Sequence, residues 1–169
     1  MPATYEPIAT NTLSSAQSSV TFSSISGSYT DLVLIITAQR ATTSENPSLT
    51  LRFNSDTATN YSITNMRGDG TNAVSARQSS QNMMNFSFFT MASAANTFST
   101  YILNIMNYAN TTTFKTVIGR SGDAGTGTQA TVGLWRSTSA ITSITITNDG
   151  SPTNFSSGST FTLYGIQAA

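Results

Sequence analysis

The amino-acid sequence predicts an all-β protein, an antiparallel β-sandwich with jelly-roll-like connections and about 8–11 strands. Short apolar blocks recur along the chain, and segments rich in Gly, Ser, Asn and Asp separate them. Ser and Thr together make up about a third of the residues, and β-branched Thr suits a pleated sheet whose hydroxyl groups face water. No segment has a clear helical pattern. We therefore expect one β-sandwich domain over residues 1–169, a length typical of a single domain.

The expected strands alternate with turn-like segments throughout the chain. In order, they are Tyr5–Leu13, Ser19–Ile25, Leu32–Arg40, Leu49–Asn54, Tyr61–Arg67, Met83–Met91, Phe98–Asn107, Thr113–Arg120, Thr128–Arg136, Ser143–Thr147 and Thr160–Ile166. The continuous apolar run Leu32–Ile36 predicts a central strand that is covered on both sides. Ile144 and Ile146 alternate with hydroxyl residues, which predicts one buried and one solvated face.

Three segments outside these strands carry separate expectations. Residues 1–12 are expected to form an extended N-terminal arm or an edge strand, because the two prolines of Pro2–Pro7 favour extended backbone. Asn72–Asn82 is polar with no clear period and is expected to be a long loop. Gly122–Gly127 is expected to be a mobile tip, because its glycines leave the backbone unconstrained.

The charge balance bears on binding partners. Charged residues make up only 8% of the chain, and seven basic residues match seven acidic ones. Nucleic-acid binding requires a concentrated basic face, and the basic residues here are scattered, so no nucleic-acid partner is expected. A surface with so few charges has little electrostatic protection against self-association, so contacts between copies of the chain are expected.

The residue types needed for most catalytic and metal sites are missing. The sequence has no cysteine and no histidine, which excludes disulfides, thiolate nucleophiles, Ser-His-Asp triads and sulfur- or imidazole-bound metals. The acidic residues are isolated, and Asp69 and Asp149 occur in sequences typical of tight turns. A calcium site at Asn54-Ser-Asp56 or Ser121-Gly-Asp123 stays open as a weaker alternative. We expect no catalytic residue, no metal, no cofactor and no enzymatic activity.

The aromatic residues admit two interpretations. The densest apolar block, Met83–Met91, and the single tryptophan, Trp135, both lie in expected strands, which favours a role in the core. The alternative is a sugar-binding platform, for which Tyr61, Tyr101, Tyr108 and Trp135 are the candidates.

The sequence also bears on location. The N-terminal residues lack the basic and apolar regions of a secretory signal, and the longest apolar run is too short to span a bilayer. We therefore expect synthesis in a cytoplasm and no membrane partner.

Several segments together resemble a widespread family of small virion-associated proteins of tailed bacteriophages. The segments that carry the resemblance are Ser19–Ile25, Tyr29–Val33, Leu51–Asp56, Asn60–Ser62, Asn107–Thr111, Phe114–Thr116, Gly133–Trp135, Ala140–Ile144 and Phe161–Ile166. They follow one another in a consistent order over nearly the whole chain. The end departs slightly, with Gln167 where related chains often have Lys.

The resemblance implies a virion structural protein with a jelly-roll-like sandwich, made in the host bacterial cytoplasm and located in the virion. We expect a capsid decoration (cement) protein, a homo-oligomer, expected to be a trimer, that binds the major capsid protein lattice on the outside of the assembled head and stabilises it. The alternative is a tail-fibre or receptor-binding module that recognises host surface glycan. Composition places the expected interface at Pro2, Tyr5, Pro7, Asp123 and Gly125, with Asn72–Asn82 as a further candidate.

Overall fold

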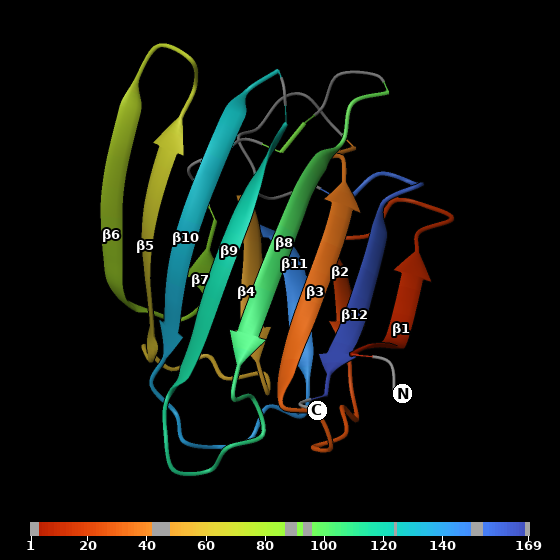
Figure 1. The fold of residues 1–169 in the computed structure, drawn as a ribbon. Helices are drawn as coiled ribbons and strands as arrows, with labels where there is room; N and C mark the ends of the chain where they lie inside the picture. Colours follow the sequence, from red (N-terminus) through yellow and green to blue (C-terminus); the bar gives the residue numbers. More distant parts are fainter. Residues whose placement is uncertain are drawn as a thin grey trace.

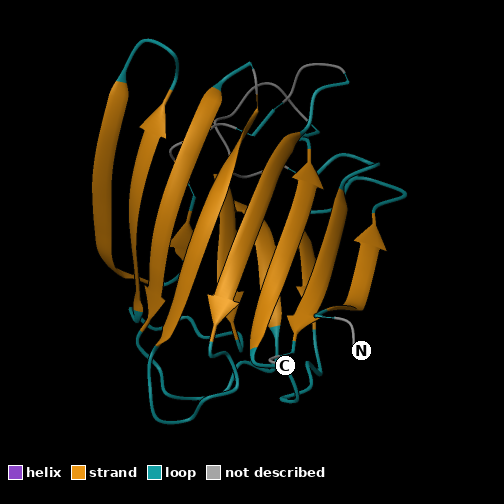
Figure 2. Cartoon of the chain, in the orientation of Figure 1, coloured by secondary structure: helices purple, strands orange, loops and turns teal. Residues whose placement is uncertain are grey.

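Two antiparallel sheets pack face to face, as Figures 1 and 2 show. The computed structural model describes residues 4–41, 48–86, 91–92, 96–123, 125–149 and 154–167. Every regular element in these ranges is a β-strand. The predicted all-β antiparallel sandwich is therefore confirmed.

The larger sheet has eight strands, and β1 and β6 form its two edges. Their spatial order is β1 (Tyr5–Thr12), β12 (Thr160–Ile166), β3 (Asp31–Ala38), β8 (Ser99–Met106), β9 (Lys115–Asp123), β10 (Gly127–Trp135), β5 (Tyr61–Gly68) and β6 (Ala73–Gln81). The strand predicted to be central, β3, lies between β12 and β8, where Leu34 pairs with both Leu163 and Leu103.

The smaller sheet has four strands and covers one face of the larger one. Its order is β2 (Ser19–Phe22), β11 (Ile144–Asp149), β4 (Ser48–Phe53) and β7 (Met84–Asn85). The chain stays within one sheet only at the β5–β6, β8–β9 and β9–β10 connections, and at every other connection between described strands it crosses to the opposite sheet. Most connections therefore run between the two layers of the sandwich.

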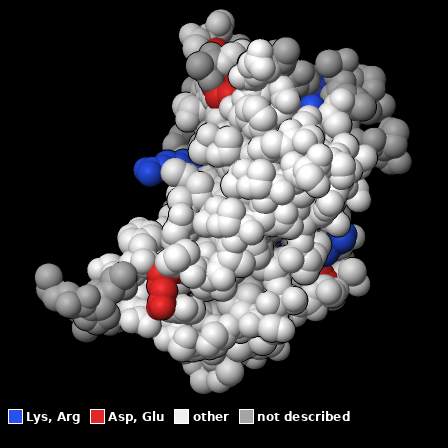
Figure 3. Space-filling model, turned by 90° about the vertical axis from the view of Figure 1, so that its right-hand side faces the viewer, with Lys and Arg blue, Asp and Glu red and all other residues white. Residues whose placement is uncertain are grey.

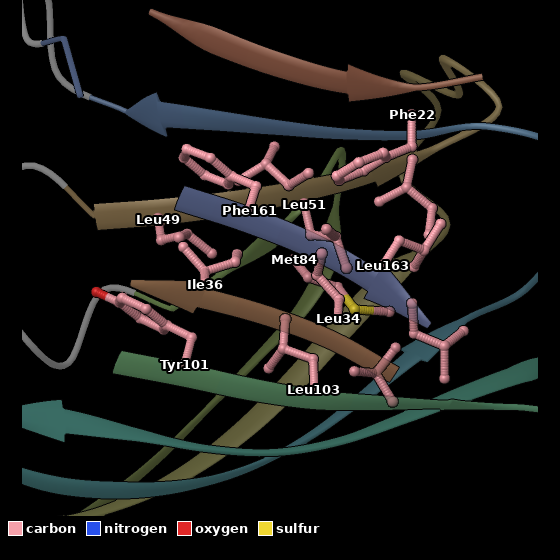
Figure 4. Close-up of a cluster of buried hydrophobic side chains, with 14 of the residues drawn as sticks. Phe22, Leu34, Ile36, Leu49, Leu51, Met84, Tyr101, Leu103, Phe161 and Leu163 are labelled. Atoms are coloured by element: carbon pink, nitrogen blue, oxygen red, sulfur yellow. The ribbon is translucent and has the colours of Figure 1, made fainter. Parts of the chain in front are cut away.

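The core lies between the two sheets and is built from alternate residues of each strand. In β8, Tyr101, Leu103 and Ile105 are buried, whereas the residues between them are partly exposed. Leu34 and Leu163 of the large sheet and Leu51 of the small sheet meet in the same apolar cluster (Figure 4). Each such side chain contributes about 1.5–3 kcal/mol on burial, which is what holds the sheets together without disulfides.

The prediction of a loop at Asn72–Asn82 is wrong, because Ala73–Gln81 forms strand β6. The strand is at the sheet edge, and nearly all of its residues are exposed or half-buried. Since neither of its faces is dry, the sequence has no apolar period that could reveal it. With β6, the described strands exceed the predicted number.

Two other segments refine the predictions. Residues Tyr5–Thr12 form β1, an edge strand paired with β12, rather than a free arm. Of the predicted strand Met83–Met91, Met84–Asn85 forms β7, and residues 87–90 lie outside the described ranges.

Candidate binding surface

The larger sheet has an apolar outer face, defined here as the side that points away from the smaller sheet. On β8 the inward residues are Tyr101, Leu103 and Ile105, so Ile102 and Met106 point outward. Residues that pair across neighbouring strands point to the same side of a sheet. Ile118 of β9 pairs with Asn104 of β8 and with Val132 of β10, so Ile118 and Val132 also point outward. The outer face therefore has a band of aliphatic side chains across its middle.

Most of the exposed large apolar side chains lie on this face. Tyr5, Met66, Met106, Ile118 and Val132 are 36–63% exposed and all face outward, and only Phe114 and Val74 are comparable elsewhere among the described residues. Single exposed apolar residues are ordinary, whereas a contiguous group across neighbouring strands marks a binding surface.

Two adjoining hollows shape the outer face. The smaller, of about 350 Å³, lies between Tyr5 and Ile118. The larger, of about 660 Å³, lies at the end of the face between the β5–β6 and β9–β10 turns. Ile102 and Arg120 line both hollows, so the two hollows adjoin at these residues.

Arg120 is the cation in the middle of this face. It belongs to β9, the fifth strand of the sheet, and pairs with Ile102 on one side and Ala130 on the other. Its side chain is exposed and makes no hydrogen bond or ion pair with any described residue. This guanidinium group lies beside the apolar Ile102 and Ala130 on the neighbouring strands. It also borders the larger hollow, which Asp69 and Asp123 line as well, and it is open to a partner.

The two turns beside the larger hollow are held by aspartates, as the sequence predicts for Asp69. Asp69 Oδ1 accepts hydrogen bonds from the backbone N–H groups of Asn72 and Thr71 at 2.7 and 2.9 Å, and these bonds lower the pKa of Asp69. Asp123 Oδ1 accepts from the N–H groups of Gly125 and Thr126, and its Oδ2 accepts from the Ser99 hydroxyl at 3.1 Å. Both carboxylates are therefore used in shaping the turns.

The β9–β10 turn requires glycine at one position. Gly122 has a φ of 152°, and a Cβ atom there would lie 2.2 Å from the carbonyl oxygen of Gly127. A side chain would push the two strands apart, so Gly122 fixes the hairpin that carries Arg120.

The outer face of the smaller sheet has a different chemistry. Thr21 and Thr145 share a hydrogen bond of 3.2 Å between their hydroxyl groups, and Thr50 bonds to Thr147 in the same way. Arg52 donates from Nε to the backbone carbonyl of Asn82 at 3.1 Å. None of the large exposed apolar residues named above lies on this sheet. Thr50 is buried, so the exposed hydroxyl pair of this outer face is that of Thr21 and Thr145.

The aromatic residues proposed for sugar binding lie inside the protein. Tyr61, Tyr101, Tyr108 and Trp135 are at most 2% exposed, which confirms the core interpretation of Trp135 and removes these rings as a glycan platform. Trp135 stacks on Tyr61, with ring centroids 6.2 Å apart, and its ring lies 5.5 Å from Phe53 of the small sheet.

Asp56 anchors this aromatic cluster. Its Oδ2 accepts hydrogen bonds from Trp135 Nε1 at 2.7 Å and Asn60 Nδ2 at 3.0 Å, and its Oδ1 accepts from the Ala58 N–H. Partial burial raises the pKa of Asp56, but the bonds from Asn60, Trp135 and Ala58 outweigh burial and leave the pKa below its usual value. The carboxylate suggested as a calcium ligand is therefore a structural acceptor. Among the described residues, no group of acidic side chains is placed to hold a metal ion.

The predicted interface residues fall in two places. Tyr5 and Pro7 are exposed on the edge strand β1, and Tyr5 lines the smaller hollow. Asp123 and Gly125 line the larger hollow. Pro2 lies outside the described residues.

Sequence reasoning missed the centre of the surface, which consists of Ile118, Arg120 and Val132. The sequence signal for this surface was weak. In Lys115–Asp123 and Gly127–Trp135, apolar residues occur at both odd and even positions, so the sequence pattern does not indicate which face of each strand is buried.

The chain matches no known protein family, no curated protein and no solved structure. Among the described residues, no helix is long and apolar enough to cross a membrane.

Proposed function

We propose that this chain is a structural protein of a tailed-phage virion, specifically a capsid decoration protein that binds the outside of the assembled head through the apolar outer face of its larger sheet. The observation that carries the proposal is the band of exposed Met66, Ile118 and Val132 on a face with a single central cation. The phage assignment itself is supported by the resemblance carried by the segments between Ser19 and Ile166.

The size of the outer face suits a stable protein–protein contact. Eight strands about 4.8 Å apart, each about eight residues long, give a face of roughly 900 Å². A standard interface buries about 800 Å² per partner. The face can therefore support specific attachment.

The chemistry of the outer face favours a protein partner over a glycan. The large exposed side chains at its centre, Met66, Ile118 and Val132, are aliphatic, and its largely exposed aromatic ring, Tyr5, lies on the edge strand β1. Sugar recognition needs aromatic faces and convergent hydrogen-bonding groups. Charged residues make up only 8% of the chain, and they are few and scattered on the side of the molecule at the β1 edge (Figure 3). Docking therefore removes water from few charged groups.

The mechanism would be mass action. A subunit that binds only the assembled lattice stabilises the lattice by the free energy of binding, and repeated sites on one head add to the effect. No bond-making chemistry is required, and we propose no enzymatic role.

Immunogold imaging of virions of the phage that carries the coding sequence tests the location. We expect label over the head. Label confined to the tail tip would instead support the fibre alternative, and unlabelled virions would overturn both.

Thermal release of DNA tests the stabilising role. Heads that lack the protein should release DNA at a lower temperature than complete heads, and adding the purified chain back should restore the higher temperature. An unchanged release temperature would contradict the decoration role.

A further inference from the structure

We infer that the partner surface of this protein has an apolar patch with a carboxylate that pairs with Arg120. The inference rests on the proposed function and adds the chemistry of the partner. It follows from where Arg120 lies, what surrounds it and which acids are free to meet it.

Arg120 lies where a docked partner must cover it. It is on the fifth of eight strands and lines both hollows, with Ile118 two residues away on the same face. Any partner that buries the aliphatic band therefore also removes water from the guanidinium group.

Among the described residues, no acidic side chain pairs with that charge. Asp69 and Asp123 line the same hollow, but their oxygens accept the hydrogen bonds of their own turns, and neither forms an ion pair with Arg120. A desolvated charge without a counter-charge is unfavourable, whereas an Arg–carboxylate pair can form two parallel hydrogen bonds. Charge complementarity therefore assigns an Asp or Glu to the partner, opposite Arg120.

A second copy of the chain fits this surface less well. Asp31 is the one acid in the described strands of the larger sheet whose register points outward. It lies at the start of β3, and its Oδ1 already accepts the Asn107 N–H at 2.6 Å. The partner we infer is thus a different protein surface.

Co-sedimentation of purified variants with heads assembled without this protein is the first test. Arg120→Glu should weaken binding at least about tenfold, because it places two carboxylates opposite each other. The matched control is Arg52→Glu, because Arg52 lies on the outer face of the smaller sheet, outside the proposed binding face. We expect the control to bind like the native chain, and circular dichroism should show that both variants are folded.

Carbodiimide coupling is the second test, because it joins an amine to a carboxylate that it contacts. Arg120→Lys bound to these heads should give an amide cross-link to an Asp or Glu of a head protein, identified by mass spectrometry. Arg52→Lys, on the outer face of the smaller sheet, should give none.

The outcomes separate the inference from the proposed function. If the native chain does not bind heads, the proposed function fails. If the native chain and Arg120→Glu bind equally well, only the inference fails. A cross-link from position 120 to Asp31 of another copy would overturn the inference in favour of self-association.

Discussion

The outer faces of the two sheets are built from strands of similar composition, yet they differ in what they can bind. The larger sheet presents Ile118, Val132 and Met66 at its centre and, among the described residues, has hydrogen-bonded threonine pairs only between its edge strand β1 and β12. The smaller sheet presents threonines that bond to one another, such as Thr21 and Thr145. Paired hydroxyl groups stay satisfied in water and gain little from a partner, whereas exposed aliphatic groups gain from leaving water. The comparison shows that one overall Ser/Thr-rich composition can conceal a face suited to docking and a face suited to solvent.

The largest expected effect comes from removing the side chain of Trp135, which packs in the core between the two sheets. Trp135→Ala should lower the free energy of unfolding by about 3–5 kcal/mol, because it leaves a cavity beside Tyr61 and Phe53. Chemical denaturation measures the loss. A change below about 1 kcal/mol would mean that the aromatic cluster is not part of the core.

The next effect tests the difference between the faces directly. Ile118→Asp should weaken head binding about 100-fold, because it buries a charge in the docked face. Thr145→Asp makes a matched change on the outer face of the smaller sheet and should leave binding unchanged. Both variants should keep native unfolding midpoints to within a few degrees. Equal losses of binding for the two variants would remove the distinction between the faces.

A smaller effect concerns pH. The pKa values of Asp56 and Asp69 are lowered in the folded protein, so the folded state binds fewer protons than the unfolded state between the folded and unfolded pKa values. Their contribution to stability is complete above about pH 4 and is lost as the pH falls through the folded values. Asp56→Asn should cost about 2 kcal/mol at pH 7 and flatten the acid side of the stability curve. A variant curve parallel to the native one would show that Asp56 does not contribute in this way.

The smallest expected effect is on the hydroxyl-lined face. Thr21→Val should change the free energy of unfolding by less than about 0.5 kcal/mol, because the bond to Thr145 is exposed to competing water. Differential scanning calorimetry can resolve the corresponding shift of the midpoint. A loss above about 1 kcal/mol would mean that the threonine pairs are structural rather than surface features.

The sequence predicts the parts of the fold that a local apolar pattern determines. The run Leu32–Ile36 identifies the interior strand β3, and the alternation around Ile144 and Ile146 identifies β11. Strand β6 was not predicted, because an edge strand that is exposed on both faces does not need apolar residues at alternate positions.

The candidate surface was harder to predict, because it depends on which strands become neighbours. Ile118 and Val132 become neighbours only through the pairing of β9 with β10. Asp56 and Trp135 are likewise far apart in the sequence, so their hydrogen bond could not be predicted from it. Only Tyr5, Asp123 and Gly125, chosen on composition, fell at the rim of the hollows.

The position of β12 between β1 and β3 has a consequence for synthesis on the ribosome. Tyr5 pairs with Ile166, so β1 has no partner in its sheet until the last strand has been translated. At about 5–20 residues per second, that delay is roughly 8–30 s. During this time β1 has no strand partner, and β2 likewise has no partner until β11 has been translated. Nascent chains that crowd on one messenger could pair such strands with each other, so expression yield should depend on translation rate as well as on the stability of the finished sandwich.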